Sequence, residues 1–148
     1  MKRIFVMVLL VMGLVGLVGC AKEDAVFKVG NDEGEYAPEQ LSGWEVERTV
    51  YVQILGPNDD ELFNGTVVVT APNPTVYHAF LGAVLSKGIP QSSSSDSGFI
   101  ESISSYVGGT NGRYWLIYNN GESLLVGTNS SQIRNGDYIQ LIFEEPSF

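Results

Sequence analysis

Hydrophobic and polar residues alternate over short stretches from residue 49 onward, and this pattern predicts strands. In the stretch 49–55 every second residue is apolar, and every residue of 66–70 is β-branched. Turn residues between the two stretches indicate a β-hairpin. The pair Asn73-Pro74 predicts a helix start, because asparagine is a good N-cap and proline suits the first helical position. Apolar residues then recur at helical spacing until Gly88.

The second half of the chain predicts further strands. The serine-rich run 91–97 indicates a flexible polar connection between the helix and the sheet. Extended structure is expected over 99–106, 113–118, 123–126 and 138–143. The sequence Asn119-Asn120-Gly121 is typical of a tight hairpin turn between two of these strands.

One helix and a strand-rich remainder define the expected fold class. A helix with one apolar stripe and a sheet with one apolar face can bury these surfaces against each other in a two-layer fold. This layout is that of an α+β domain of the β-grasp (ubiquitin-like) type, spanning 47–148. The sequence offers no second helix for the other face of the sheet. A ligand or partner is therefore expected on that face or at the loops of one edge.

The N-terminus resembles a bacterial lipoprotein signal. Met1-Lys2-Arg3 is charged, the stretch 4–18 is apolar but short for a membrane span, and small residues precede Cys20. The resemblance implies a cleaved signal peptide over 1–19 and lipidation of Cys20. An uncleaved signal anchor is the alternative. In both cases the rest of the chain lies outside the cytoplasmic membrane, and lipidation would anchor it at the cell surface.

Charge narrows the classes of partner. The formal net charge is −9, and without residues 1–19 it is −11, with 6 basic against 17 acidic residues. Such a chain repels nucleic acid and anionic lipid surfaces.

The acidic segment 20–46 is expected to be a flexible tether. Cys20 is the only cysteine, so its acylation would leave no thiol for a disulfide, a metal site or a nucleophile.

Catalytic signatures are absent from the sequence: it has no nucleophile elbow, phosphate-binding loop, zinc motif or EF-hand. His78 is the only histidine, and we expect a solvated surface residue rather than a general base or metal ligand. The acidic run 58–61 offers oxygen ligands for calcium, but a solubilising hairpin tip is the simpler interpretation. We therefore expect a protein that is not an enzyme and requires no cofactor.

The strand 114–118 concentrates large side chains on both of its faces. Trp115 and Ile117 share one face, and Tyr114, Leu116 and Tyr118 share the other. Exposed rings would mark a recognition surface, whereas a buried Trp115 would simply belong to the core.

At these residues the chain resembles the transcobalamin-like C-terminal domain, found in bacterial surface lipoproteins and in intrinsic factor, transcobalamin and haptocorrin. The resemblance lies in Gly98 to Ile103, Tyr114-Trp115, Asn120-Gly121 and Arg134 to Ile139. In the animal carriers this domain closes over the corrin ring. By position, the resemblance implies these ligand-contacting residues: Gly98, Phe99, Ile100, Trp115, Leu116, Ile117, Tyr118 and Leu124.

Two departures from the carriers limit what the resemblance implies. Leu116 stands where the carriers usually have glutamine, and nothing in the chain supplies their helical barrel. We therefore expect a lipid-anchored, ligand-binding protein for cobalamin or another corrinoid in uptake. A transporter or surface-protein partner would provide the second wall of the site. The alternative is a cell-surface interaction or adhesion module that binds a protein or a glycan.

Overall fold

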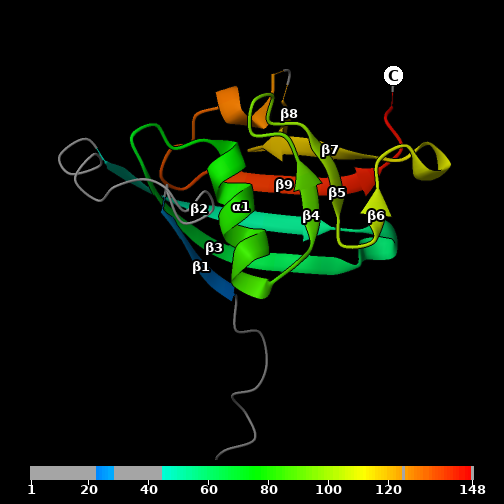
Figure 1. The fold of residues 1–148 in the computed structure, drawn as a ribbon, viewed down its shortest axis with the longest axis horizontal. Helices are drawn as coiled ribbons and strands as arrows, with labels where there is room; N and C mark the ends of the chain where they lie inside the picture. Colours follow the sequence, from blue (N-terminus) through cyan, green and yellow to red (C-terminus); the bar gives the residue numbers. More distant parts are fainter. Residues whose placement is uncertain (1–22, 29–44, 125, 148) are drawn as a thin grey trace, which may run out of the picture.

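The computed structural model describes residues 23–28, 45–124 and 126–147, which form an α+β fold with one α-helix (Figure 1). The predicted signal 1–19 and Cys20 lie outside the described residues. The described elements are, in chain order, β1 (Glu23–Lys28), β2 (Val46–Leu55), β3 (Glu61–Ala71), α1 (Val76–Lys87), β4 (Gln91–Ser93), β5 (Ile100–Ile103), β6 (Tyr106–Val107), β7 (Tyr114–Asn119), β8 (Glu122–Ser123) and β9 (Tyr138–Glu144).

The main sheet is mixed and has the strand order β1-β3-β2-β9-β7-β8. The predicted hairpin is present, since β2 and β3 are antiparallel. The pairs β1 with β3 and β2 with β9 are parallel, and β7 is antiparallel to both β9 and β8. Both central residues of the predicted β7–β8 turn, Asn120 and Gly121, have positive φ, as a primed hairpin turn requires.

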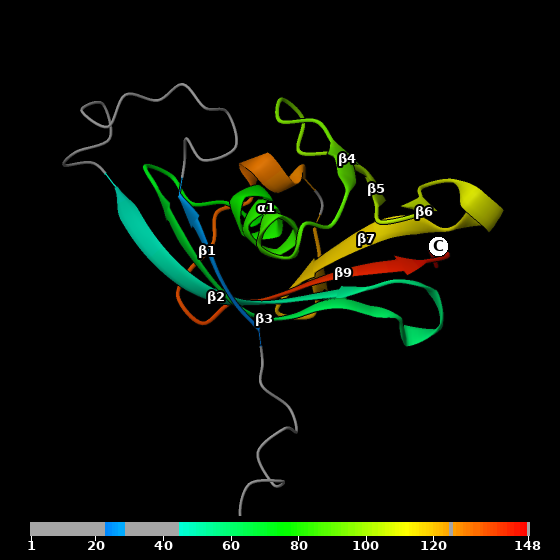
Figure 2. The ribbon, with the colours of Figure 1, turned by 60° about the horizontal axis from the view of Figure 1, so that its bottom comes forward.

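Two elements cover the same face of the main sheet. Figure 2 shows α1 lying over β1 to β3, while the small antiparallel sheet β4-β5-β6 lies nearer to β7. Alternate residues of the main strands point into this layer and are buried, including Val50, Val52 and Ile54 of β2. The opposite face, which we call the outer face, has no described helix or sheet over it. The core therefore lies on one side of the sheet only.

The acidic segment is not a tether throughout, because Glu23–Lys28 forms β1. Ala25 and Phe27 alternate with polar or exposed residues and are buried beneath α1, at 3% and 2% exposure. Glu23, the first residue of β1, forms an ion pair of 2.7 Å with Lys87, the last residue of α1. The expectation of a flexible tether is wrong for these six residues, since their short alternating pattern buries enough apolar surface to order them.

The helix start differs from the expected one. Thr75, not Asn73, is the N-cap: its hydroxyl accepts from the His78 backbone, and its own N–H donates to His78 Nδ1 at 3.2 Å. The helix ends as predicted at Gly88, which has φ +62°. His78 is half-buried, and its ring stacks on Phe27 with 5.6 Å between centroids. It is a helix-capping residue rather than the freely solvated residue we expected.

The serine run is also more ordered than expected, because Gln91–Ser93 forms β4 and pairs with β5. Tyr77 of the helix contributes by sharing a hydrogen bond with the Ser93 hydroxyl at 2.9 Å. Serine has low strand propensity, so this contact and the β5 partner override the local preference.

No helix in the described part of the chain is long and apolar enough to cross a bilayer.

Candidate functional site

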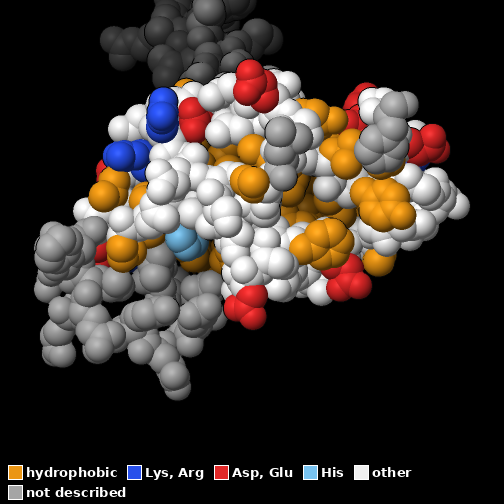
Figure 3. Space-filling view, turned by 90° about the horizontal axis from the view of Figure 1, so that it is seen from above, with side chains coloured by type: hydrophobic (Ala, Val, Ile, Leu, Met, Phe, Trp, Pro, Cys, Tyr) orange, Lys and Arg blue, Asp and Glu red, His pale blue; other side chains and the backbone are white. Residues whose placement is uncertain are grey.

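An apolar hollow of about 450 Å³ lies between the start of β5, one edge of β7 and the segment after β8. Figure 3, viewed from the side of β7 and β8, shows hydrophobic side chains gathered around a hollow, with acidic side chains toward the margins. The lining residues are Ser97, Gly98, Phe99, Ile100, Trp115, Leu116, Ile117, Ser123, Leu124, Val126, Gly127 and Thr128. Seven of the eight residues singled out in the sequence are therefore brought together here.

The exposed apolar surface of the hollow comes from its rim. Phe99 is 62% exposed and Val126 is 58% exposed, although both are large hydrophobic residues. They belong to segments that flank the hollow from β5 and from the residues after β8. Solvent-exposed apolar side chains beside a concave surface are typical of a ligand-binding region.

Trp115 is part of the core as well as of the hollow. Its side chain is only 7% exposed, and its ring centroid lies 5.1 Å from that of Phe143. The indole Nε1–H donates to the Tyr106 backbone carbonyl at 3.0 Å, which ties β7 to β6. The broad exposed indole surface that the sequence allowed is therefore not present. Trp115 forms a rigid floor, and the exposed apolar groups are Phe99 and Val126.

One stretch of the β7 edge borders the hollow. β7 pairs with β9 along its whole length but with β8 only at Tyr118 and Asn119. The Leu124 N–H donates to the Ile117 carbonyl at 2.9 Å, so this carbonyl faces the β8 side. Because peptide groups alternate between the two edges of a strand, the N–H and C=O of Trp115 face the same way. No described strand pairs with β7 at that position.

The two flanks of the hollow are joined by a buried contact. Thr128, 1% exposed, donates its hydroxyl to the Gly98 carbonyl at 2.6 Å. Gly98 has φ +68°, and a Cβ there would overlap backbone and side-chain atoms of Thr128 and the backbone nitrogen of Asn129, so only glycine fits. No sequence signal identifies Thr128, because it lies 30 residues from Gly98 in a turn without a motif.

Tyr118 is the predicted site residue that does not line the hollow. It points to the outer face, where it lines a groove of about 600 Å³ with Tyr114 and Leu116. Its hydroxyl donates to Glu144 Oε1 at 2.7 Å. This hydrogen bond, with burial and the nearby negative charge, raises the pKa of Tyr118 above its usual value. Alternation along β7 explains the separation, since Tyr118 and Trp115 point to opposite faces.

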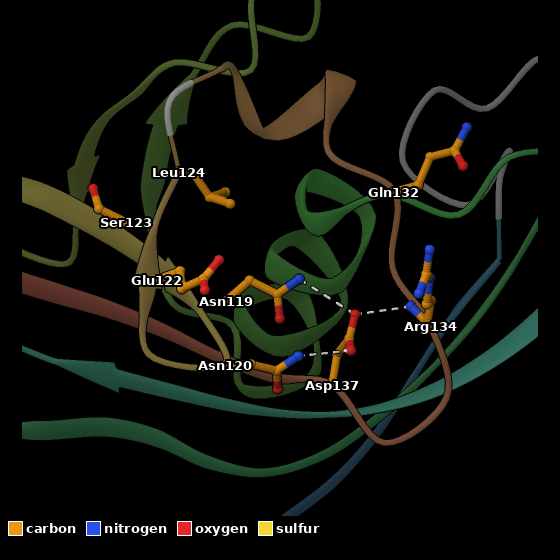
Figure 4. Close-up of a pocket in the computed structure, with 8 residues that line it drawn as sticks. All are labelled: Asn119, Asn120, Glu122, Ser123, Leu124, Gln132, Arg134 and Asp137. Carbon is orange, nitrogen blue, oxygen red and sulfur yellow. Dashed lines mark hydrogen bonds between the residues drawn. The ribbon is translucent and has the colours of Figure 1, made fainter.

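A second, polar pocket of about 610 Å³ adjoins the hollow and shares Ser123 and Leu124 with it (Figure 4). Its centre is Asp137, which accepts hydrogen bonds from the Arg134 backbone N–H and the side-chain amides of Asn119 and Asn120. Burial alone would raise the pKa of Asp137, but these donors outweigh it and lower the pKa.

These donors give Asp137 a structural role. Three N–H groups donate to its two carboxylate oxygens, so the group holds the β7–β8 turn against the 134–137 turn. The Asn120-Gly121 signal indicated the first turn, but not its link to the second.

The acidic loop predicted from the sequence also has a structural partner. The carboxylate of Asp60, in the predicted acidic loop, accepts from the Tyr106 hydroxyl at 2.7 Å and so connects that loop to β6. This bond raises the pKa of Tyr106. Within the described ranges no three His, Cys, Asp or Glu side chains are grouped as metal ligands.

Comparison with known proteins gives two similarities. The family described as "Domain of unknown function (DUF4430)", a transcobalamin-like domain family, matches residues 78–145. This range contains every residue of the apolar hollow. No curated protein matches the chain.

Among solved structures, the chain is similar to a proposed metal-binding protein from Ruminococcus gnavus ATCC 29149. The sequence identity is 13% and the TM-score 0.48, and the likeness covers 68% of this chain and 99% of the other. At this identity and score the likeness carries no information about function.

Proposed function

We propose that this chain is an extracytoplasmic protein that binds a small amphipathic ligand in the apolar hollow, and that the ligand is a corrinoid. The observation that carries the proposal is the convergence on one hollow of seven of the eight residues named from the transcobalamin resemblance. The family match over 78–145 is consistent with it.

The chemistry of the hollow suits a flat ligand with polar groups around its edge. Phe99 and Val126 offer exposed apolar surface, and the Trp115 peptide groups offer a hydrogen-bond donor and acceptor at its margin. A corrinoid combines an apolar ring face with peripheral carboxamides, which pair well with peptide groups. The ring face would lie on the rim residues, while a carboxamide bonds to the strand edge.

The size of the hollow implies a second component. At about 450 Å³ it cannot enclose a corrinoid, so this chain would supply one wall of the site. Tight sites bury most of a ligand's surface, and one open wall alone gives weak binding. We propose that a transporter or another surface protein supplies the second wall during uptake.

The remaining parts of the proposal concern architecture and location. We propose that the β2–β3 hairpin, α1 and the mixed sheet form a β-grasp domain, and that residues 1–19 are a lipoprotein signal. Lipidation of Cys20 would then anchor the protein at the outer surface of the bacterial cytoplasmic or outer membrane. Binding without catalysis fits the structural roles of His78 and Asp137 described above.

Equilibrium dialysis of the full chain in a mild detergent against cyanocobalamin tests the proposal. We expect saturable binding with a Kd below about 1 mM, weakened about tenfold by Phe99→Ala through loss of apolar contact. Leu85→Ala is the matched control, because Leu85 is also an exposed hydrophobic residue but lies on α1 away from the hollow. Absence of saturable binding, or equal loss in both variants, would overturn the corrinoid assignment.

A further inference from the structure

The outer face of the main sheet carries a second surface with its own chemistry. Six side chains at neighbouring positions of the paired strands β2, β9 and β7 lie together on this face. We call them the outer patch: Tyr51, Gln53, Tyr138, Gln140, Leu116 and Tyr118. Tyr51 pairs with Tyr138, and Gln53 and Tyr118 both pair with Gln140. None of the six is charged, although the chain carries 25 charged residues. The patch is therefore a neutral area on an acidic protein.

Hydrogen bonds hold the polar side chains of the outer patch in place. Gln53 Oε1 accepts from the Tyr138 hydroxyl at 2.8 Å and from Gln140 Nε2 at 3.1 Å. Gln140 Nε2 also donates to the Tyr138 hydroxyl at 3.3 Å. A side chain that is already fixed loses little conformational entropy when a ligand binds. The network thus holds amide and hydroxyl groups in fixed positions on the outer face.

Aromatic surface lies beside these polar groups. Tyr51 is 44% exposed and Tyr138 is 37% exposed. On the other side of the patch, Leu116 and Tyr118 form part of the groove of about 600 Å³, together with the 46% exposed Tyr114. The patch and the groove form one continuous surface, since they share Leu116 and Tyr118.

From this arrangement we infer that the outer patch binds a neutral glycan. Sugar rings present apolar C–H faces that stack on tyrosine rings, and hydroxyl groups that exchange hydrogen bonds with glutamine amides and tyrosine hydroxyls. The outer patch, with rings beside fixed amides, offers both kinds of contact. The elongated surface from the patch into the groove suits several successive sugar units rather than one.

Charge distinguishes a neutral glycan from other occupants. Carboxylates lie at two margins of the patch: Glu61 accepts from Gln53 Nε2 at 3.5 Å, and Glu144 accepts from Tyr118. They repel anionic polymers, and a net charge of −9 opposes pairing with a second copy. A cationic partner would gain most from a carboxylate at the centre, where the patch has none. The inference does not rest on the corrinoid proposal, because Leu116 is the one residue of the outer patch that also lines the hollow.

Affinity electrophoresis of the full chain in detergent tests this inference with dextran, galactomannan and a β-1,3-glucan as probes. We expect retardation by at least one of these neutral polysaccharides and none by carboxymethyl-dextran, the charged counterpart of dextran. Tyr51→Ala and Tyr138→Ala should each weaken the retained interaction about three- to tenfold, through loss of a stacking surface.

Two controls separate the outcomes. Val26→Ala alters an exposed residue of the same outer face at the β1 edge, and it should leave retention unchanged. Phe99→Ala alters the hollow, and it should lower corrinoid binding while leaving glycan retention intact. The inference is overturned if no neutral polysaccharide is retained. It is equally overturned if sedimentation shows a dimer that Tyr51→Ala dissociates, because the patch would then be a contact between copies.

Discussion

Thr128 and Gly98 are joined by a hydrogen bond of 2.6 Å, from the threonine hydroxyl to the glycine carbonyl, and this bond fixes the shape of the apolar hollow. The two residues are 30 positions apart and lie on opposite flanks of the hollow. Thr128 is buried, so neither partner can exchange this bond for one to water. The relative position of Phe99 and Val126 therefore depends on it.

Replacing Thr128 by valine should destabilise the protein and impair the hollow. The change keeps the side-chain shape but leaves the Gly98 carbonyl without its buried donor, which costs about 1–3 kcal/mol in the free energy of unfolding. Denaturant unfolding measures that cost, and cyanocobalamin dialysis measures the accompanying loss of affinity. Thr128→Ser keeps the hydroxyl and should recover most of the affinity. Equal affinity in the valine variant and the original chain would contradict this role.

The strand β1 provides a direct test of the structure in the acidic segment. Phe27 is 2% exposed under α1, whereas its neighbour Val26 is 71% exposed on the outer face. We expect Phe27→Ala to lower the free energy of unfolding by about 3–5 kcal/mol, because it removes a buried ring and leaves a cavity. Val26→Ala should change it by less than about 0.5 kcal/mol. Similar small effects from both variants would mean that this segment is a tether after all.

The sequence pattern predicted some strands of the sheet and missed others. The alternation of Val50, Val52 and Ile54, and of Ile139, Leu141 and Phe143, correctly predicted β2 and β9, because both strands bury one face for several residues. β1 was missed because only Ala25 and Phe27 mark it, amid acidic neighbours. The β4 strand was missed because its serines are held by β5 and by Tyr77 rather than by their own preference.

The candidate site was likewise predictable only in part. Phe99 and Trp115 were identified through a resemblance, and the fold brings them to one hollow. Val126 and Thr128 were not identified, since they follow a turn whose path depends on tertiary contacts with Gly98. Tyr118 does not line the hollow, because side-chain alternation along β7 places it on the outer face.

Asp137 should make stability depend on pH in the acidic range. Its pKa in the folded protein is lowered, so its contribution is fully present above the unfolded value near 3.8 and is lost as pH falls through the lower folded pKa. We expect the original chain to lose more stability than Asp137→Asn between about pH 5 and pH 2. At neutral pH the variant should be less stable by about 1–2 kcal/mol. Parallel pH profiles of the two proteins in thermal unfolding would contradict this account.

The hydrogen bond from Tyr118 to Glu144 should have the opposite pH dependence. The pKa of Tyr118 is raised, so its contribution to stability is fully present below the unfolded value near 10 and is lost as pH rises through the higher folded pKa. Tyr118→Phe should cost about 0.5–1.5 kcal/mol at neutral pH, and the difference from the original chain should shrink above about pH 10.

Difference titration of phenolate absorbance between the original chain and Tyr118→Phe measures the pKa directly. Glu144→Gln is the informative control, because it removes the negative charge but retains an acceptor for the hydroxyl. The Tyr118 pKa should then move back toward 10, while the raised pKa of Tyr106 should stay, since that residue is bonded to Asp60 instead. If Glu144→Gln left the Tyr118 pKa unchanged, the negative charge of Glu144 at the margin of the outer patch would not be the cause of the shift.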